Sequence, residues 1–576
     1  METMDSVLET LNAILWHDTV VFVLLGTGIL FTFWSGFCQW RSLTHGWAVI
    51  RGRYDDPNDP GAINHFQALS TALSATVGLG NIGGVALAIA LGGPGAVFWM
   101  WVVGVFGMSI KLTEVTLSML YRNTDDPDNP HGGPMWVVSK GLRRSFPRLA
   151  PLGTIIGGIF CVTLLISAIT GGNMFQAWNV GQITETYFGV PGVVSGIILA
   201  TVVGMVIIGG IKRIGAVAGR LVPAMCLLYL LGGSYVLIVN VDQIPGIFVL
   251  IVTSAFTASE ATGAFIGGTA AFAFLIGMKR ALFSNEAGQG SAPIAHAAAK
   301  TNEPVREGVV AGLEPFIDTL VVCTFTALVI LSTGIWNRPA EVHFDTPPAV
   351  ESAGEQRWTL ASTEAPELPR ASGDWTQGQN VFVIVEAHEN VQSGNSLHRI
   401  DGSVRIEDDG AVFIDWGTLR SPQAPELQDG GIYFVYVGAT LTAKAFDSVV
   451  DGLGMWLITI AAWLFAISTI ISWSYYGEQG IIYLMGKGAV LPYKLGYCAL
   501  IIVATLGFIQ TDAQLDNFTG VGTGVMLIAN VPIMLFFGYQ AMRAYRNYIN
   551  RLRDGRLGPG HAAPSVEDLI SGRDVR

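Results

Sequence analysis

Charged side chains are scarce in this sequence. Asp, Glu, Lys and Arg make up 13% of the 576 residues, whereas 51% are hydrophobic and the mean hydropathy is +0.48. Soluble domains carry about 25% charged residues, so a soluble enzyme is excluded and a polytopic membrane protein is predicted. Basic residues are outnumbered 32 to 44. The chain therefore also lacks the basic surface that nucleic-acid binding needs.

Cysteine clusters and the common enzyme signatures are missing too. The five cysteines stand singly in apolar segments, which favours neither a disulfide framework nor a zinc site. No HExxH, GxSxG or phosphate-binding loop is present. We therefore expect no enzyme, no catalytic residue and no cofactor.

Long apolar runs are what the sequence has in abundance. A helix needs about 20 apolar residues to cross a bilayer. Eleven segments reach roughly this length: 19–37, 68–91, 94–119, 152–180, 191–210, 219–240, 246–283, 308–334, 446–485, 491–510 and 519–541. Lys and Arg crowd alternate loops and the C-terminal tail, but are absent from the loops at 184–189, 240–243 and 511–517. The positive-inside rule then predicts a multi-pass plasma (inner) membrane protein with its N-terminus outside and its C-terminus in the cytoplasm.

Two apolar segments contain glycines and polar side chains in mid-span. The second segment has Ser74, Thr76, Gly78, Gly80, Asn81, Gly83 and Gly84. The seventh has a similar run over 262–269. A face of small residues for helix packing is one interpretation. Because the two segments run in opposite directions, we favour two broken helices in repeats of inverted topology, which is typical of secondary transporters.

This interpretation divides the chain into six parts. We assign the first span and its loops to 1–67 and the first five-helix repeat to 68–240. The second repeat begins at 241–336 and is completed by 439–541. An insert at 337–438 interrupts it, and a cytoplasmic tail covers 542–576. The predicted fold is an all-α polytopic membrane protein with inverted five-helix repeats and one preceding helix.

The insert differs from the rest in composition. It contains 16 acidic and 6 basic residues, and so carries most of the net charge of −12. Alternating apolar residues predict strands at Val381–Glu386, Val404–Glu407, Ala411–Trp416 and Ile432–Val437, with a hairpin turn at 408–410. The stretch 347–378 is predicted to be loop. We expect a small β-rich cap outside the membrane, dispensable for transport because both repeats are complete without it.

An unwound helix offers a specific kind of binding site. Its free N–H groups and the half-helix dipole can hold a carboxylate, and its free carbonyls can hold an ammonium group or Na⁺. Neither predicted break contains Asp or Glu to neutralise a purely cationic substrate. A small neutral zwitterion is therefore the favoured substrate.

Three long motifs resemble the alanine or glycine:cation symporter family. They are the Ser-Ala-Thr-Val-Gly-Leu-Gly-Asn-Ile-Gly-Gly run within 68–94, the Ser-Asn-Glu-Ala-Gly-Gln-Gly-Ser-Ala-Pro run within 279–296, and 468–477. The resemblance implies the inverted-repeat fold of neurotransmitter:sodium symporters and Na⁺-driven uptake of alanine or glycine. A solute sensor on a transporter scaffold and a proton-coupled carrier are the alternatives. Neither the oligomeric state nor any partner besides amino acid, Na⁺ and lipid follows from it.

The resemblance also implies site residues. The substrate set is Thr76, Gly78, Leu79, Gly80, Asn173, Gln176, Thr262, Gly263, Phe265 and Trp473. The sodium set is Ser74, Thr76, Val77, Asn81, Phe465, Ser468 and Thr469, whose oxygens suit a hard cation.

Several of these residues have a structural alternative. Asn173 and Gln176 could instead hydrogen-bond neighbouring helices, and the Thr469 hydroxyl could bond back to the Phe465 carbonyl. Three carboxylates are gating candidates: Glu114, Glu286 and Asp318. Glu114 could instead simply reach the membrane surface.

Overall fold

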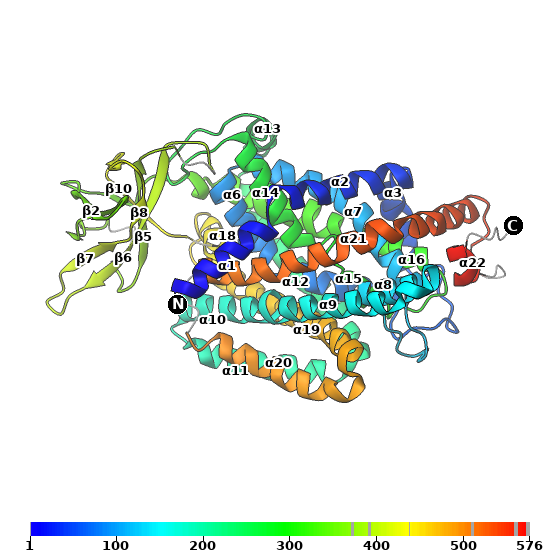
Figure 1. Cartoon of the computed structure of the whole chain (residues 1–576). Coiled ribbons are helices and arrows are strands. Elements are labelled where there is room, and N and C mark those ends of the chain that lie inside the picture. The colour runs from blue at the N-terminus through cyan, green and yellow to red at the C-terminus, as the bar shows by residue number, and fades with distance from the viewer. Residues whose placement is uncertain are drawn as a thin grey trace.

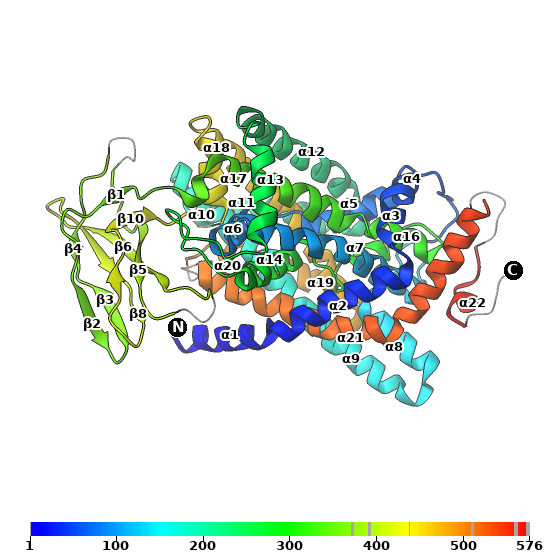
Figure 2. The ribbon, with the colours of Figure 1, turned by 90° about the horizontal axis from the view of Figure 1, so that it is seen from above.

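The protein consists of a long helical body with a β-sheet unit at one end (Figure 1). The computed structural model describes residues 2–369, 374–389, 393–436, 438–507, 512–557 and 563–571. The N-terminus lies at the end that carries the β-sheet unit, and the C-terminus lies at the opposite end (Figures 1 and 2). We call these the insert end and the tail end. Which of them faces the cytoplasm stays a prediction.

Each of the eleven apolar segments contains a helix. The first half of the body comprises α1 (Glu2–Leu15), α2 (Asp18–Ser35), α3 (Cys38–Arg41), α4 (Trp47–Ile50), α5 (His65–Thr76), α6 (Val85–Gly92), α7 (Gly95–Tyr121), α8 (Pro134–Ser145), α9 (Ala150–Ile169), α10 (Phe175–Phe188), α11 (Gly192–Ile207) and α12 (Gly210–Val239). The second half comprises α13 (Ile244–Ser254), α14 (Ala270–Asn285), α15 (Ala292–His296), α16 (Pro304–Ala311), α17 (Thr324–Thr333), α18 (Ala439–Asp447), α19 (Leu453–Met485), α20 (Val490–Ala504), α21 (Asp512–Arg553) and α22 (Val566–Ser571). Within the described residues, eight helices are long and apolar enough to span a membrane. The bent α5–α6 pair and the shorter α11 and α13 account for the remaining segments.

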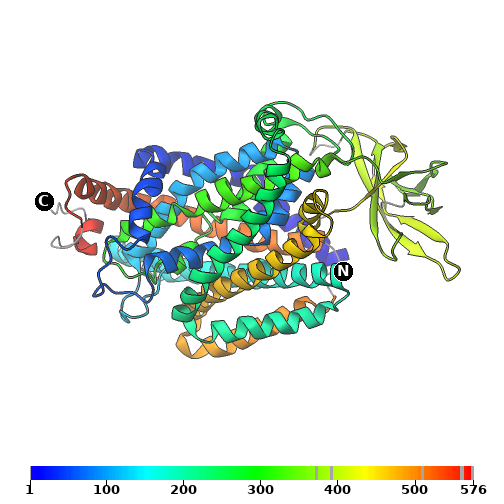
Figure 3. The ribbon, with the colours of Figure 1, turned by 180° about the vertical axis from the view of Figure 1, so that it is seen from behind.

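Long helices pack side by side around the two broken spans. Figure 3 shows α11 and α20 side by side along one edge of the body, where they are in contact. Short π-helical turns occur in three of the spans, the first broken span among them: η2 (Gly80–Gly84), η4 (Thr170–Met174) and η5 (Phe316–Cys323). π-helical turns are rare in proteins, and many of those observed lie at functional sites.

The first break lies where the sequence predicts it. Helix α5 ends at Thr76, Val77 is extended (φ −76°, ψ 92°), and the chain resumes as η2 and α6 at an angle of 54° to α5. Glycine in a helix interior costs about 1 kcal/mol, and a cluster of them makes unwinding cheap.

The predicted position of the second break is wrong. Residues 255–269 are not mid-span but connect α13 to α14 at the insert end, and α13 lies across the long helices (Figure 2). The helix breaks instead at 286–291, between α14 and α15, where Glu286 (φ 54°), Gly288 and Gly290 have positive φ. Helix α14 packs along α6, and α15 packs along α5. The two broken spans are therefore antiparallel neighbours, as the inverted repeat requires.

The insert folds as two antiparallel sheets. Its strands are β1 (Val342–His343), β2 (Val350–Gly354), β3 (Arg357–Leu360), β4 (Thr363–Glu364), β5 (Asn380–Glu386), β6 (Leu397–Ile406), β7 (Val412–Trp416), β8 (Leu419–Arg420), β9 (Glu426–Leu427) and β10 (Gly431–Phe434). The larger sheet has the order β1-β10-β5-β6-β7-β4, with β9 also paired to β5, and the smaller sheet is β2-β3-β8. Buried apolar residues such as Val383, Ile400 and Ile414 form the core of the insert.

Four predicted strands are confirmed as β5, β6, β7 and β10, although Val437 lies outside the described residues. The hairpin turn is also confirmed, because the Gly410 N–H donates to the Glu407 carbonyl at 2.9 Å. The loop predicted at 347–378 is wrong, since β2, β3 and β4 lie there. Strand β2 is almost wholly exposed, so its sequence lacks the alternation that a half-buried strand shows.

Candidate functional site

In the first break, a side chain of the unwound segment hydrogen-bonds to the backbone of the same segment. The Gly78 N–H donates to Asn81 Oδ1 at 2.8 Å, which satisfies one of the groups that unwinding sets free. Val77 and Leu79 are buried. A Cβ placed on Gly80 would lie 3.4 Å from the ring of Phe283 on α14. The unwound backbone thus faces the second broken span at close range.

Gly78 lies between two polar side chains from other helices. A Cβ at this position would lie 2.8 Å from Thr469 Oγ1 on α19 and 3.8 Å from Gln176 Oε1 on α10. Both oxygens are buried and have no hydrogen-bond partner within the described part of the chain. A back-bond from Thr469 to Phe465 is therefore not formed here. Leaving a buried acceptor unpaired costs about 1–3 kcal/mol, and a bound ligand would remove that cost.

Asn173 and Trp473 complete this side of the site. The Asn173 amide donates to the Tyr497 carbonyl at 2.8 Å, as a helix-to-helix bond would, but its Oδ1 is buried without a partner in the residues described. The Gln176 amide donates within its own span, to the Gly171 carbonyl at 3.1 Å. Trp473 is buried against Gly172, where a Cβ would come within 2.3 Å of the indole.

Serine hydroxyls and carbonyls gather where α5 meets α19. Ser74 Oγ donates to the Ser468 carbonyl at 2.6 Å, and Ser468 Oγ lies 3.0 Å from the Phe465 carbonyl and 3.4 Å from that of Ser74. The next residue along α19 is Thr469, with its unpaired hydroxyl. The structure thus brings these members of the predicted sodium set together beside Val77.

A buried carboxylate lies at the break itself. Asn81 Nδ2 donates to Asp318 Oδ1 at 2.5 Å and to Ser284 Oγ at 3.0 Å. Ser284 and Thr319 both donate to Asp318 Oδ2 at 2.8 Å. The expected gating residue Asp318 therefore contacts the site directly, from η5. The Thr76 hydroxyl turns away from it, toward the carbonyls of its own helix at 3.4 Å.

Three predicted substrate residues lie elsewhere. A Cβ on Gly263 would lie 2.2 Å from the Arg338 carbonyl, Thr262 is exposed, and Phe265 packs on Trp336 with 5.3 Å between ring centroids. All three belong to the α13–α14 connection at the insert end. The residues of the second broken span that do face the first break are Phe283 and Ser284, which glycine counting missed. Both residues belong to the 279–296 motif, which was the sequence signal that could have assigned them to the site.

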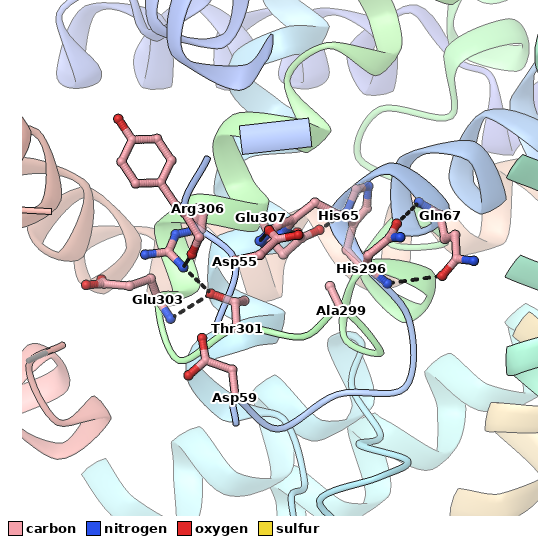
Figure 4. Close-up of polar contacts among 12 residues, drawn as sticks. Asp55, Asp59, His65, Gln67, His296, Ala299, Thr301, Glu303, Arg306 and Glu307 are labelled. Carbon is pink, nitrogen blue, oxygen red and sulfur yellow. Dashed lines mark hydrogen bonds and ion pairs between the residues drawn. The ribbon is translucent and has the colours of Figure 1, made fainter. Parts of the chain in front are cut away.

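At the tail end, a chain of buried ionizable side chains joins both broken spans. His65 on α5 and His296 on α15 each contact the Glu307 carboxylate on α16, the second at 2.5 Å (Figure 4). His296 Nε2 lies 2.7 Å from Glu314, and Glu314 lies 3.1 Å from Lys111 Nζ on α7. All five side chains are at most 1% exposed.

The other two gating candidates border this chain. Glu114 Oε1 lies 3.9 Å from Lys111 Nζ, and its Oε2 accepts from Asn530 on α21 at 3.1 Å. Glu286 accepts from Ser291 Oγ at 2.5 Å across the second break. Both carboxylates are buried within the protein.

At the insert end, by contrast, a cavity of about 410 Å³ leads toward the break. Leu79 of the break lines it, together with Trp178 and Gln182 of α10 and Thr440 of α18. Three residues of the insert, Asn380, Asp401 and Val435, line it as well. The first break is thus reached by a cavity from the insert end, whereas buried ionizable side chains join the two broken spans toward the tail end.

Comparison with known proteins identifies the family. The sequence profile of the sodium:alanine symporter family matches residues 1–356 and 432–561. The sodium/alanine symporter AgcS of Methanococcus maripaludis is 35% identical over 534 residues, 92% of this chain and 95% of that protein. Two Bacillus subtilis proteins are also similar. YrbD, a putative sodium/proton-dependent alanine carrier, is 30% identical over 96% of this chain and 94% of its own length; the uncharacterized transporter YflA is 39% identical over 58% and 69%.

Proposed function

This chain belongs to the sodium:alanine symporter family, and on that basis we propose that it carries a small neutral amino acid, alanine or glycine, together with Na⁺. The observation that carries the proposal is the meeting of two antiparallel broken helices, where Gly78 lies between the unpaired Thr469 and Gln176 oxygens. A membrane-embedded site of this kind is what a secondary transporter needs.

The site offers partners for both charged groups of an amino acid. The N–H groups of Leu79 and Gly80 lie where η2 and α6 begin, so the helix dipole favours a carboxylate there. The unpaired oxygens of Gln176 and Asn173 are acceptors for the ammonium group. Phe283 and Trp473 limit the space for a side chain. An added methylene costs about 1–3 kcal/mol in a tight pocket, so leucine should compete poorly with alanine.

Sodium has two candidate positions. The carbonyls of Ser74, Val77 and Phe465 with the hydroxyls of Ser468 and Thr469 form one set. The Thr76 carbonyl, the Asn81 side chain and the Asp318 carboxylate form the other, in which Asp318 takes a ligand role rather than a gating one. Oxygen ligands suit hard cations, and a buried carboxylate adds the counter-charge that a desolvated ion requires.

Uptake of labelled alanine into proteoliposomes under an imposed ion gradient tests the proposal. We expect accumulation with an inward Na⁺ gradient and none with K⁺ in its place at constant pH. Equal uptake in both conditions would overturn Na⁺ coupling. Accumulation driven by a proton gradient alone would favour the proton-coupled alternative.

A further inference from the structure

The cavity at the insert end suggests that the β-sheet insert takes part in transport. We infer that Asp401, assisted by Asn380, is a first binding point for the ammonium group of the incoming amino acid. The inference rests on the proposed function and extends it. It also narrows the expectation that the insert is dispensable, because the insert then contributes to apparent affinity without being needed for translocation.

The cavity connects the insert to the break. Leu79 is at the break, whereas Asn380 lies on β5 and Asp401 on β6 of the insert's larger sheet. Of the residues that line this cavity, Asp401 is the one with a charged side chain. A substrate that moves from the insert end toward Leu79 therefore passes a single fixed negative charge.

The Asp401 carboxylate is available to a ligand. It makes no hydrogen bond within the described residues, and its charged neighbour is Arg399, two positions along the same strand. Arg399 is engaged elsewhere: its Nη2 donates to the Ala264 carbonyl at 2.7 Å, and its guanidinium lies 4.3 Å from the Phe382 ring. Burial lowers the pKa of Arg399 to about 10, which still leaves it charged at neutral pH.

The insert is held firmly enough to keep Asp401 in place. Asn395 donates to the Ile266 carbonyl at 2.6 Å, and the Thr269 N–H donates to the Ser393 carbonyl at 2.9 Å. Ala264 of the α13–α14 connection is buried in an apolar cluster with Phe382, Ile384 and Tyr433 of the insert. Thr269 is also the N-cap of α14. The sheet is thus fastened to the start of the second broken span.

Physical chemistry predicts which substrates this arrangement favours. A cavity with one sign of charge concentrates ligands of the opposite sign and raises their association rate, and this effect falls with ionic strength. The ammonium group of a neutral amino acid is attracted into a negatively charged cavity, whereas the extra carboxylate of an acidic amino acid is repelled from it. Asp401 should therefore act on substrate entry and leave the later steps unchanged.

Initial-rate uptake of alanine by the full-length protein in proteoliposomes, at fixed Na⁺, tests the inference. We expect Asp401→Asn to raise KM about threefold or more with kcat nearly unchanged, and Asp401→Lys to raise KM further and to allow glutamate to compete. The matched control is Asp415→Asn, an exposed carboxylate on β7 of the same sheet that pairs with Arg405 and does not line the cavity. It should behave like the wild type.

The outcomes separate the inference from the proposed function. A wild type that fails to take up alanine with Na⁺ would overturn the proposed function. An active wild type with Asp401→Asn and Asp415→Asn kinetically alike would overturn the inference alone. Should Asp401 variants fold poorly, the wild type decides: KM that rises as choline chloride is added at constant Na⁺ supports the inference, and a flat KM overturns it.

Discussion

The two ends of the broken helices are built differently. At the insert end, a cavity reaches Leu79 of the first break, and its lining, from α10, α18, α19 and the insert, contains one carboxylate. At the tail end, α5 and α15 are joined through the single carboxylate of Glu307, which belongs to a fully buried chain of ionizable side chains. Separating buried partners leaves uncompensated charge in a dry interior, which is strongly unfavourable. The tail end should therefore open only as a unit, whereas the insert end is already accessible.

Removing the centre of the buried chain should have the largest effect. We expect Glu307→Ala to lower the free energy of unfolding by about 3–5 kcal/mol, because it leaves His65 and His296 without their shared partner. Fluorescence-detected size exclusion after heating measures the change. Glu567→Ala serves as control. Glu567 lies in the C-terminal region and forms an exposed pair with Arg144 of α8, so this variant should melt like the wild type. Equal melting of both variants would contradict a structural role for the buried chain.

Filling the break should abolish transport without unfolding the protein. In Gly78→Ala the new methyl group would lie 2.8 Å from Thr469 Oγ1, in the space assigned to ligand, so we expect uptake to fall at least tenfold. Gly84→Ala is the matched control, since a Cβ there meets nothing within 4 Å. Normal uptake by Gly78→Ala would place the substrate elsewhere.

Removing one proposed sodium ligand should have a smaller and more specific effect. We expect Thr469→Ala to raise the Na⁺ concentration for half-maximal uptake severalfold, with partial rescue by more Na⁺. Reciprocity requires the apparent alanine affinity at low Na⁺ to fall as well. In the control Thr459→Ala, the lost hydroxyl only bonded to the Met455 carbonyl of its own helix at 2.6 Å. A Thr469→Ala curve that overlays the wild type would remove Thr469 from the sodium site.

Surface charge at the tail end should matter least. Lys487 lies 3.4 Å from Asp126, with both side chains largely exposed. Exposed pairs contribute about 0–1 kcal/mol. Lys487→Ala should change neither melting nor uptake beyond experimental error. A marked loss of either would show that surface contacts, and not the buried chain alone, hold the tail end closed.

Local signals predicted one break and misplaced the other. The first break coincides with four glycines and three polar side chains, so the low cost of unwinding was visible in the sequence. The run at 262–269 is similar, with three glycines and two threonines, but forms a connection against the insert, while the real break at 286–291 has only two glycines. Glycine makes unwinding cheap, but neighbouring helices decide where the released backbone groups find partners.

The sequence by itself determined the apolar segments, the first break, the acidic β-rich insert and, through its motifs, the family. These depend on composition and on residues close together in the chain. Only the tertiary structure placed Asp318 and Ser284 beside Asn81, left Thr469 Oγ1 and Gln176 Oε1 without a hydrogen-bond partner among the described residues, and brought Asp401 to the cavity. The Asn81–Ser284 contact joins residues 203 positions apart. Such contacts depend on how helices pack in three dimensions, and neither hydropathy nor spacing records that packing.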